Sequence, residues 1–161
     1  MTLSDTSNMY KINDFDRLDL TLTKGKITSI IDTVTGATLK SFHQRLTQPK
    51  VAKLYILKEK NDYLYVGTTM QSLTTRTRYG LTADGKTGYH GYKWKDKEKV
   101  ELYVWCFDGL NKIQIESIEA EFVFLIRKKT GHWPLTQNEI HFNNEFVGGK
   151  IFAEKLFKWT Q

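Results

Sequence analysis

The first fifty residues carry short runs in which polar and apolar side chains alternate. Alternation over residues 19–23 is typical of a strand that is buried on one face. The Lys-Gly-Lys run at 24–26 interrupts this pattern as a turn, and residues 27–31 can form the returning strand. The pattern therefore predicts a β-rich, hairpin-like N-terminal extension over residues 1–50, with no obvious chemistry of its own.

Residues 51–161 follow a different pattern, in which apolar runs alternate with helical periodicity. Strands are predicted over residues 53–57, 63–66 and 100–107. Helices are predicted from Thr68 or Thr69 to Arg78, over 114–130 with an end at Gly131, and over 149–159. This order predicts an α+β fold with a small, mostly antiparallel three-stranded sheet flanked by helices. The chain then divides into an extension (1–50) and a core (51–161).

Length and composition fit one globular domain. The chain has 161 residues, and no apolar run approaches the roughly 18 residues that cross a bilayer. The polar N-terminus lacks the apolar stretch of a secretory signal. Cys106 is the only cysteine, which excludes an internal disulfide and fits a reducing compartment. We therefore expect a cytoplasmic protein without a membrane partner.

The charge balance narrows the choice of partner. A net charge of +6 and a pI near 9.3 favour a polyanion such as DNA or RNA. The histidines and the cysteine form neither a CxxC nor an HExxH pattern, which argues against structural zinc. An enzyme that acts on another phosphorylated substrate is a minor alternative, because the chain has no Walker A loop and no GxGxxG.

Three residues in the core share a spacing that suggests phosphate chemistry. Tyr55 and Tyr65 lie in consecutive predicted strands, and Arg76 lies in the predicted helix that follows. Two strands joined by a tight turn can bring both phenols to one side of a sheet, and Gly67 lets the chain turn sharply and a ligand approach closely. A guanidinium pointing back to that spot can hold a phosphate through two parallel hydrogen bonds.

With these motifs the chain resembles the GIY-YIG nuclease family. Leu54-Tyr55-Ile56 stands for GIY, with leucine in place of the first glycine, and Tyr65-Val66-Gly67 stands for YIG. Arg76 stands for the helix arginine of the family, and a glutamate on the helix over 114–130 completes the pattern. Pro134 and Asn138 follow that helix, so the resemblance covers roughly residues 52–140.

The resemblance implies a role for each of these residues. Tyr55 would act as the general base that takes a proton from water, and Tyr65 would position the water or the phosphate. Arg76 would neutralise the pentavalent phosphate. Glu121 would bind one divalent ion, Mg²⁺ or Mn²⁺, which polarises the phosphate and assists the leaving oxygen. The structural alternative is that both tyrosines are ordinary strand residues and that Arg76 is solvated.

The metal ligand has two rivals. At about 100° per residue, Glu119 falls inside the apolar arc of the helix and Glu121 falls at its edge. The distance to Pro134 and Asn138 favours Glu121 under the resemblance, whereas the helical wheel favours Glu119. Glu139 is a third candidate, so the choice stays open at this point.

A loop between the predicted arginine helix and the third strand is a candidate DNA contact. Residues 88–94 mix aromatic side chains with His90 and Lys93, which can lie near a phosphate. The alternative is a loop held down by Tyr92 and Trp94. Together with the resemblance, these features predict a metal-dependent DNA endonuclease of the GIY-YIG type. A site-specific restriction enzyme, a mobile-element enzyme and a repair enzyme are all open at this point, and a restriction enzyme would act as a homodimer to make double-strand breaks. The other reading is a DNA-binding module of this fold that does not cut.

Overall fold

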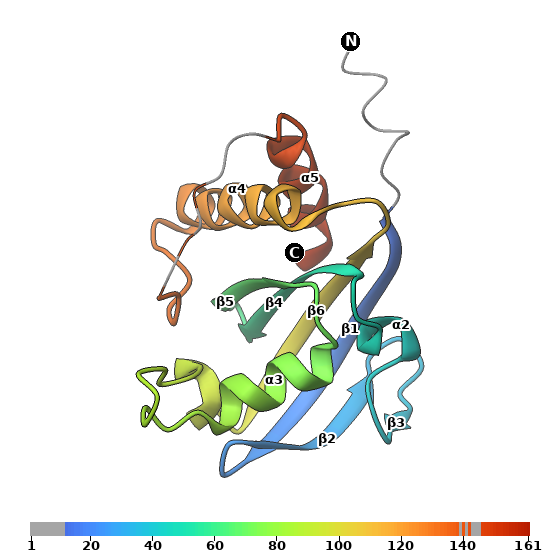
Figure 1. The fold of residues 1–161 in the computed structure, drawn as a ribbon, viewed down its shortest axis with the longest axis vertical. Helices are drawn as coiled ribbons and strands as arrows, with labels where there is room; N and C mark the ends of the chain where they lie inside the picture. Colours follow the sequence, from blue (N-terminus) through green and yellow to red (C-terminus); the bar gives the residue numbers. More distant parts are fainter. Residues whose placement is uncertain (1–11, 139, 141, 143–145) are drawn as a thin grey trace.

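The computed structural model describes residues 12–138, 140, 142 and 146–161. Its described strands form one six-stranded sheet in the order β3-β2-β1-β6-β4-β5, with every neighbouring pair antiparallel (Figure 1). The strands are β1 (Ile12–Thr23), β2 (Lys26–Asp32), β3 (Thr38–Leu39), β4 (Ala52–Glu59), β5 (Asp62–Thr69) and β6 (Lys99–Phe107). The α+β class is confirmed. The prediction of a three-stranded sheet is wrong, because the N-terminal strands join the sheet of the core.

The predicted N-terminal hairpin is present, but it is an integral part of this sheet. In β1 Leu18, Leu20 and Leu22 are buried and alternate with polar residues. The turn at Lys24 and Gly25 has φ values of 49° and 69°, the left-handed values that a type I′ hairpin turn requires. On its other edge β1 pairs with β6, so it lies inside the sheet and not in a separate layer.

Helices cover both faces of the sheet. α4 (Lys112–Thr130) and α5 (Gly149–Phe157) pack on one face, and α3 (Leu73–Thr82) packs on the other (Figure 1). The other described helices are α2 (Gln44–Thr47), η1 (Lys93–Asp96) and η2 (Lys158–Thr160). β4 is buried on both sides, and its central residues Leu54 to Leu57 form an apolar run on both faces. Leu54 and Ile56 belong to the core under α4, whereas Tyr55 and Leu57 belong to the core under α3.

The ends of α4 follow from local chemistry. Asn111 and Gln114 form a reciprocal capping box at its start, with two hydrogen bonds of 2.9 Å. Gly131 ends it in the left-handed conformation, with φ 86°, as predicted. The helix predicted from residue 68 or 69 instead starts at Leu73, because β5 continues through Thr69.

The outer edge of β5 is partly covered by the chain that follows α4. The side-chain amide of Gln137 accepts a hydrogen bond from Val66 N at 2.9 Å and donates one to Val66 O at 3.0 Å. The backbone N–H of Thr136 donates to Leu64 O at 2.8 Å. Past Val66, Thr68 and Thr69 line an open cleft. The covering segment therefore leaves the end of β5 accessible from the side.

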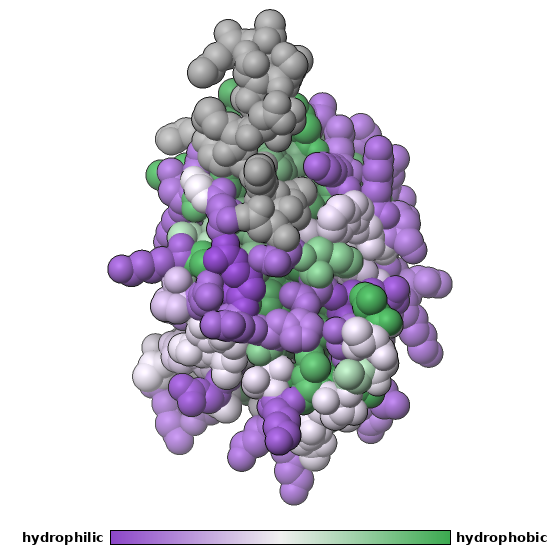
Figure 2. All heavy atoms as spheres, turned by 90° about the vertical axis from the view of Figure 1, so that its right-hand side faces the viewer, coloured by the Kyte–Doolittle hydropathy of each residue, from purple (hydrophilic) through white to green (hydrophobic). Residues whose placement is uncertain are grey.

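The remaining surface is largely polar on the side of β3 and α2. That face carries mainly hydrophilic side chains, with small apolar patches between them (Figure 2). Among the helices that the structure describes, none combines the length and the apolar character that crossing a bilayer requires.

Candidate active site

The cleft at the end of β5 has a volume of about 390 Å³ and lies between α3 and α4, which cover opposite faces of the sheet. Its lining residues are Tyr65, Thr68, Thr69, Met70, Gln71, Arg76, Lys112, Ile115, Glu116 and Glu119. The strand β5, the helix α3 that follows it and the distant helix α4 therefore contribute a phenol, a guanidinium and a carboxylate to one space. Because β5 is an edge strand, a ligand can reach them without passing through the sheet.

Arg76 enters the cleft from α3 and is half-buried. Its Nε atom is buried and has no hydrogen-bond partner among the described residues. Burial lowers the pKa of Arg76, but the neighbouring phenols of Tyr55, Tyr92 and Tyr65 outweigh it, and the pKa ends above its ordinary value. The side chain therefore stays charged at any working pH. A buried donor without a partner costs free energy, and an anion in the cleft would relieve that cost.

Glu119 enters from α4, on the opposite side of the cleft. Only 4% of the residue is exposed, and its Oε2 accepts one hydrogen bond, of 3.0 Å, from the hydroxyl of Thr68. Burial raises the pKa of Glu119 to about 7, since the Thr68 hydrogen bond and the charge of Arg76 compensate only in part. Glu116 lies one turn earlier, lines the same cleft and adds to this rise. The cleft thus holds a carboxyl group whose negative charge is only partly compensated by neighbouring donors and cations.

Tyr65 and Tyr55 differ in access to the cleft. Tyr65 is half-buried and lines it, whereas Tyr55 is 0% exposed and lies behind Tyr65, with 6.1 Å between the ring centroids. The Tyr55 hydroxyl is 2.8 Å from that of Tyr92. Burial raises the pKa of Tyr55 well above its ordinary value and also raises that of Tyr65. Tyr55 therefore has no direct access to the cleft in this arrangement, and its role as the general base stays a prediction that this burial does not favour.

Gly67 makes this packing of two tyrosines possible. A Cβ atom at this position would lie 2.6 Å from the Tyr55 Cζ and hydroxyl oxygen and 2.6 Å from Tyr65 Cε1. Real Cβ contacts do not occur at such distances, so any side chain at 67 would displace one of the rings. The sequence predicts that Gly67 lets a ligand approach closely. In the structure, the absence of a side chain at this position leaves space for the two tyrosine rings.

Tyr92 is the member of the site that sequence reasoning missed. It was expected only to pack down a loop, yet it is 3% exposed and its ring centroid lies 5.2 Å from that of Tyr65 and 5.7 Å from Arg76 Cζ. The ring occupies the space next to Gly80, where a Cβ would meet it at 2.0 Å. It therefore supports both Arg76 and Tyr65 from behind. The two glycines at 80 and 91 are the only sequence signal that we can connect with it.

Glu121 lies elsewhere. It lines a separate pocket of about 240 Å³ between α4 and α5, beside Lys128 and Lys150. Two residues along a helix turn the side chain by about 200°, so Glu119 and Glu121 cannot face the same cleft. Glu121 therefore does not share the cleft with Tyr65 and Arg76, whereas Glu119 does, as the helical wheel indicated. Which carboxylate binds a metal stays a prediction. Glu139 lies outside the described residues.

The predicted DNA contacts, His90 and Lys93, are both exposed and lie outside the lining of the cleft. His90 lies in the loop after α3, where the Nζ of Lys95 donates to its carbonyl oxygen at 3.1 Å. Tyr92 and Trp94, in contrast, are buried and fasten this region to the sheet. A role of His90 and Lys93 in binding nucleic acid stays a prediction.

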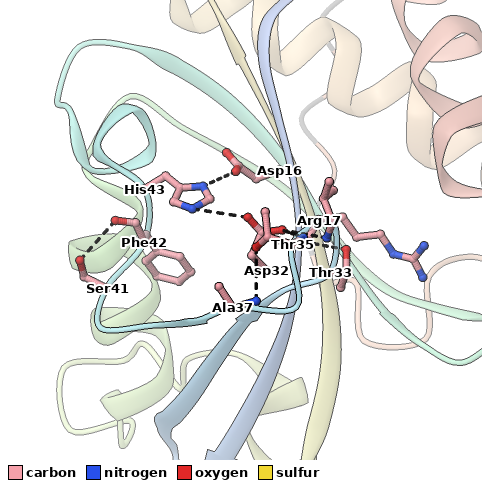
Figure 3. Close-up of polar contacts among 10 residues, drawn as sticks. Asp16, Arg17, Asp32, Thr33, Thr35, Ala37, Ser41, Phe42 and His43 are labelled. Atoms are coloured by element: carbon pink, nitrogen blue, oxygen red, sulfur yellow. Dashed lines mark hydrogen bonds and ion pairs between the residues drawn. The ribbon is translucent and has the colours of Figure 1, made fainter.

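A second polar cluster joins the segment before α2 to the sheet (Figure 3). His43 Nδ1 pairs with Asp16, and His43 Nε2 lies 3.7 Å from Asp32 Oδ2. The backbone N–H groups of Thr35 and Val34 donate to Asp32 and hold its pKa below the ordinary value. These contacts hold the turn after β2 and the segment before α2 against the sheet. The cluster is therefore explained by its structural role.

Comparisons of the chain with protein-family models, curated proteins and solved structures found no match. The function must therefore be argued from the cleft itself.

Proposed function

We propose that the protein is a metal-dependent phosphodiesterase that cuts DNA, with the cleft between α3 and α4 as its active site. The observation that carries the proposal is that Arg76, Glu119 and Tyr65 share this cleft, although α4, which carries Glu119, lies far along the chain from β5 and α3. A charged donor and a buried acid at opposite sides of one small space suit a phosphate together with a cation.

Arg76 is the group that would hold the phosphate. Its guanidinium is permanently charged and carries a buried Nε–H for which the described residues supply no acceptor. A phosphate oxygen would fill that place, and the planar guanidinium can bind two oxygens at once. A preorganised, half-buried charge would stabilise the extra negative charge of the pentavalent transition state more strongly than a charge in bulk water could.

The donor set of the cleft fits Mg²⁺ or Mn²⁺. Such cations take oxygen ligands, and Mg²⁺ is usually bound through one or two carboxylates, with waters and substrate phosphate oxygens as the other ligands. Glu119 and Glu116 supply two carboxylates next to each other on α4. The described residues hold no group of three or more His, Cys, Asp or Glu side chains placed for a metal, so substrate oxygens and waters would have to supply the remaining ligands. A cation held there would supply positive charge to the phosphate and make water more acidic.

The three tyrosines would then act as a rigid wall that places the reacting groups. Tyr65 is the one phenol of the three that lines the cleft, and its raised pKa keeps its hydrogen available for donation to the phosphate or the attacking water. Tyr55 and Tyr92, joined through their hydroxyls, support Tyr65 and Arg76 without touching a substrate. They are positioning residues in this scheme.

DNA is proposed as the substrate on two grounds. The net charge of +6 favours a polyanion, and the sequence resembles the GIY-YIG nucleases. Leu54 replaces a glycine of that pattern, but its side chain is completely buried in the core under α4. The substitution therefore fills a core position and leaves the cleft open.

A plasmid-nicking assay tests the proposal with a matched pair of variants. Glu119→Gln and Glu121→Gln make the same chemical change two residues apart on one helix, but only Glu119 lines the cleft. Supercoiled DNA should be nicked by the parent and by Glu121→Gln in Mg²⁺ or Mn²⁺, and by neither in EDTA. Glu119→Gln should leave it intact. Equal nicking by all three proteins would refute the assignment, and retarded but uncut DNA would favour the binding module.

A further inference from the structure

A stacked pair of tyrosines, of which Tyr79 is exposed, lies on α3 and the loop that follows it and is not explained by the proposed reaction. The rings of Tyr79, on α3, and Tyr89, in the loop that follows, have centroids 5.1 Å apart and are tilted by only 5°. Tyr79 is 54% exposed. Tyr89 covers one face of the ring, and the exposure of Tyr79 leaves another part of the ring available to a ligand.

The pair is adjacent to the groups that would hold the scissile phosphate. Tyr79 follows Arg76 by three residues, and residues three apart lie on the same side of a helix. Tyr89 is close enough to Tyr65 and Tyr92 that its phenol, after burial and nearer charged groups, contributes to raising the pKa of both. The pair therefore lies near the rim of the cleft, on the side of α3 that carries Arg76, although neither ring lines the cleft.

The charge of this region matches a nucleic-acid strand. From Leu73 to Asp96, α3, the loop and η1 carry five cationic side chains against two acidic ones, a net +3 out of +6 for the chain. The cationic residues are Arg76, Arg78, Lys86, Lys93 and Lys95. An aromatic ring amid cationic side chains is the arrangement with which proteins bind single strands, since bases stack on the ring and phosphates meet the charges.

We infer that the Tyr79–Tyr89 pair is a stacking platform for an unpaired base next to the phosphate bound by Arg76. The inference rests on the proposed function and gives it a substrate class: single-stranded DNA, or DNA with an unpaired nucleotide at the cut. In a regular duplex the base faces are covered by their neighbours, so a ring at the rim has nothing to stack on.

Equilibrium binding tests this without any need for cleavage. Fluorescence anisotropy in EDTA would compare a labelled single-stranded 16-mer with its blunt duplex. Tyr79→Ala should raise the Kd for the single strand by about fivefold or more, since base–aromatic stacking has about that worth per base. The Kd for the duplex should stay within about twofold. Tyr79→Phe keeps the ring and should bind both ligands like the parent.

Phe124→Ala is the matched control, because Phe124 is an equally exposed ring, 53%, on α4. It should leave both dissociation constants unchanged. An equal loss on single strand and duplex with Tyr79→Ala, or no loss on either, would overturn the inference while leaving the nicking result untouched. A selective loss in a protein that never cuts DNA would support the platform and count against the nuclease.

Discussion

Replacement of Glu119 by glutamine should stabilise the protein at alkaline pH while abolishing its activity. In the folded protein burial raises the pKa of this carboxyl to about 7, from an ordinary value of 4.5. The folded chain therefore binds the proton more tightly than the unfolded chain does. The stabilisation from the protonated form is fully present below about pH 4.5 and is lost as the pH rises through about 7.

The size of the effect follows from that gap in pKa. A difference from 4.5 to about 7 corresponds to about 3 kcal/mol between pH 4 and pH 8. Glutamine has the shape of the protonated acid and can still accept the hydrogen bond from Thr68, but it never ionises. In a chain of this length about 3 kcal/mol moves the melting temperature by about 6 to 12 °C.

Thermal unfolding at pH 5 and pH 8 measures this directly. Glu119→Gln should melt well above the parent at pH 8 and close to it at pH 5, whereas Glu121→Gln should follow the parent at both. Added Mg²⁺ should raise the melting temperature of the parent at pH 8 and leave that of Glu119→Gln unchanged, because a bound cation stabilises the folded state. If the two glutamine variants behave alike, Glu119 is not the uncompensated buried acid that the cleft suggests.

Three further substitutions probe the surroundings of the cleft. Arg76→Ala should reduce the single-turnover cleavage rate by about 10² to 10³-fold, as expected for the loss of one preorganised charged donor, and an unchanged rate would exclude a phosphate contact. Gly67→Ala should destabilise the protein by about 1 to 3 kcal/mol, because the new methyl meets the Tyr55 ring at 2.6 Å; a urea titration showing unchanged stability would contradict that packing. Lys53→Met should cost about 3 kcal/mol or more in the same titration, since the buried Lys53 ammonium donates to three backbone carbonyls, and a neutral result would show that water replaces it.

The parts of the fold that could be predicted from the sequence have causes within a few residues. The end of α4 at Gly131 and the hairpin at Lys24 and Gly25 each depend on a local backbone conformation. The size of the sheet could not be predicted in this way. β1 pairs with β6 across more than eighty positions of sequence, with Arg17 opposite Tyr103 and in contact with Glu101, and no local pattern encodes that neighbour.

Residues of the candidate site were predictable where sequence spacing and strand geometry determine their position. They were not predictable where tertiary packing determines it. Tyr65 and Arg76 share the cleft as their spacing suggested. The choice between Glu119 and Glu121 depended on which face of α4 meets the sheet, and the apolar arc carried that information. The role of Tyr92 could not be predicted, because it packs beside Tyr55, from which it is separated by 37 positions of sequence.

The shared cleft implies that Arg76 and Glu119 act on the same phosphate, and a double-mutant cycle measures this. Single-turnover cleavage of one labelled DNA would be followed for the parent, Arg76→Ala, Glu119→Gln and the double variant. If both residues stabilise one transition state, the cleavage rate of the double variant should be only slightly below that of either single variant. Once one of the two residues is lost, the other contributes little to the rate. Losses that multiply, or a parent protein that leaves the DNA uncut, would contradict a single site formed by α3 and α4.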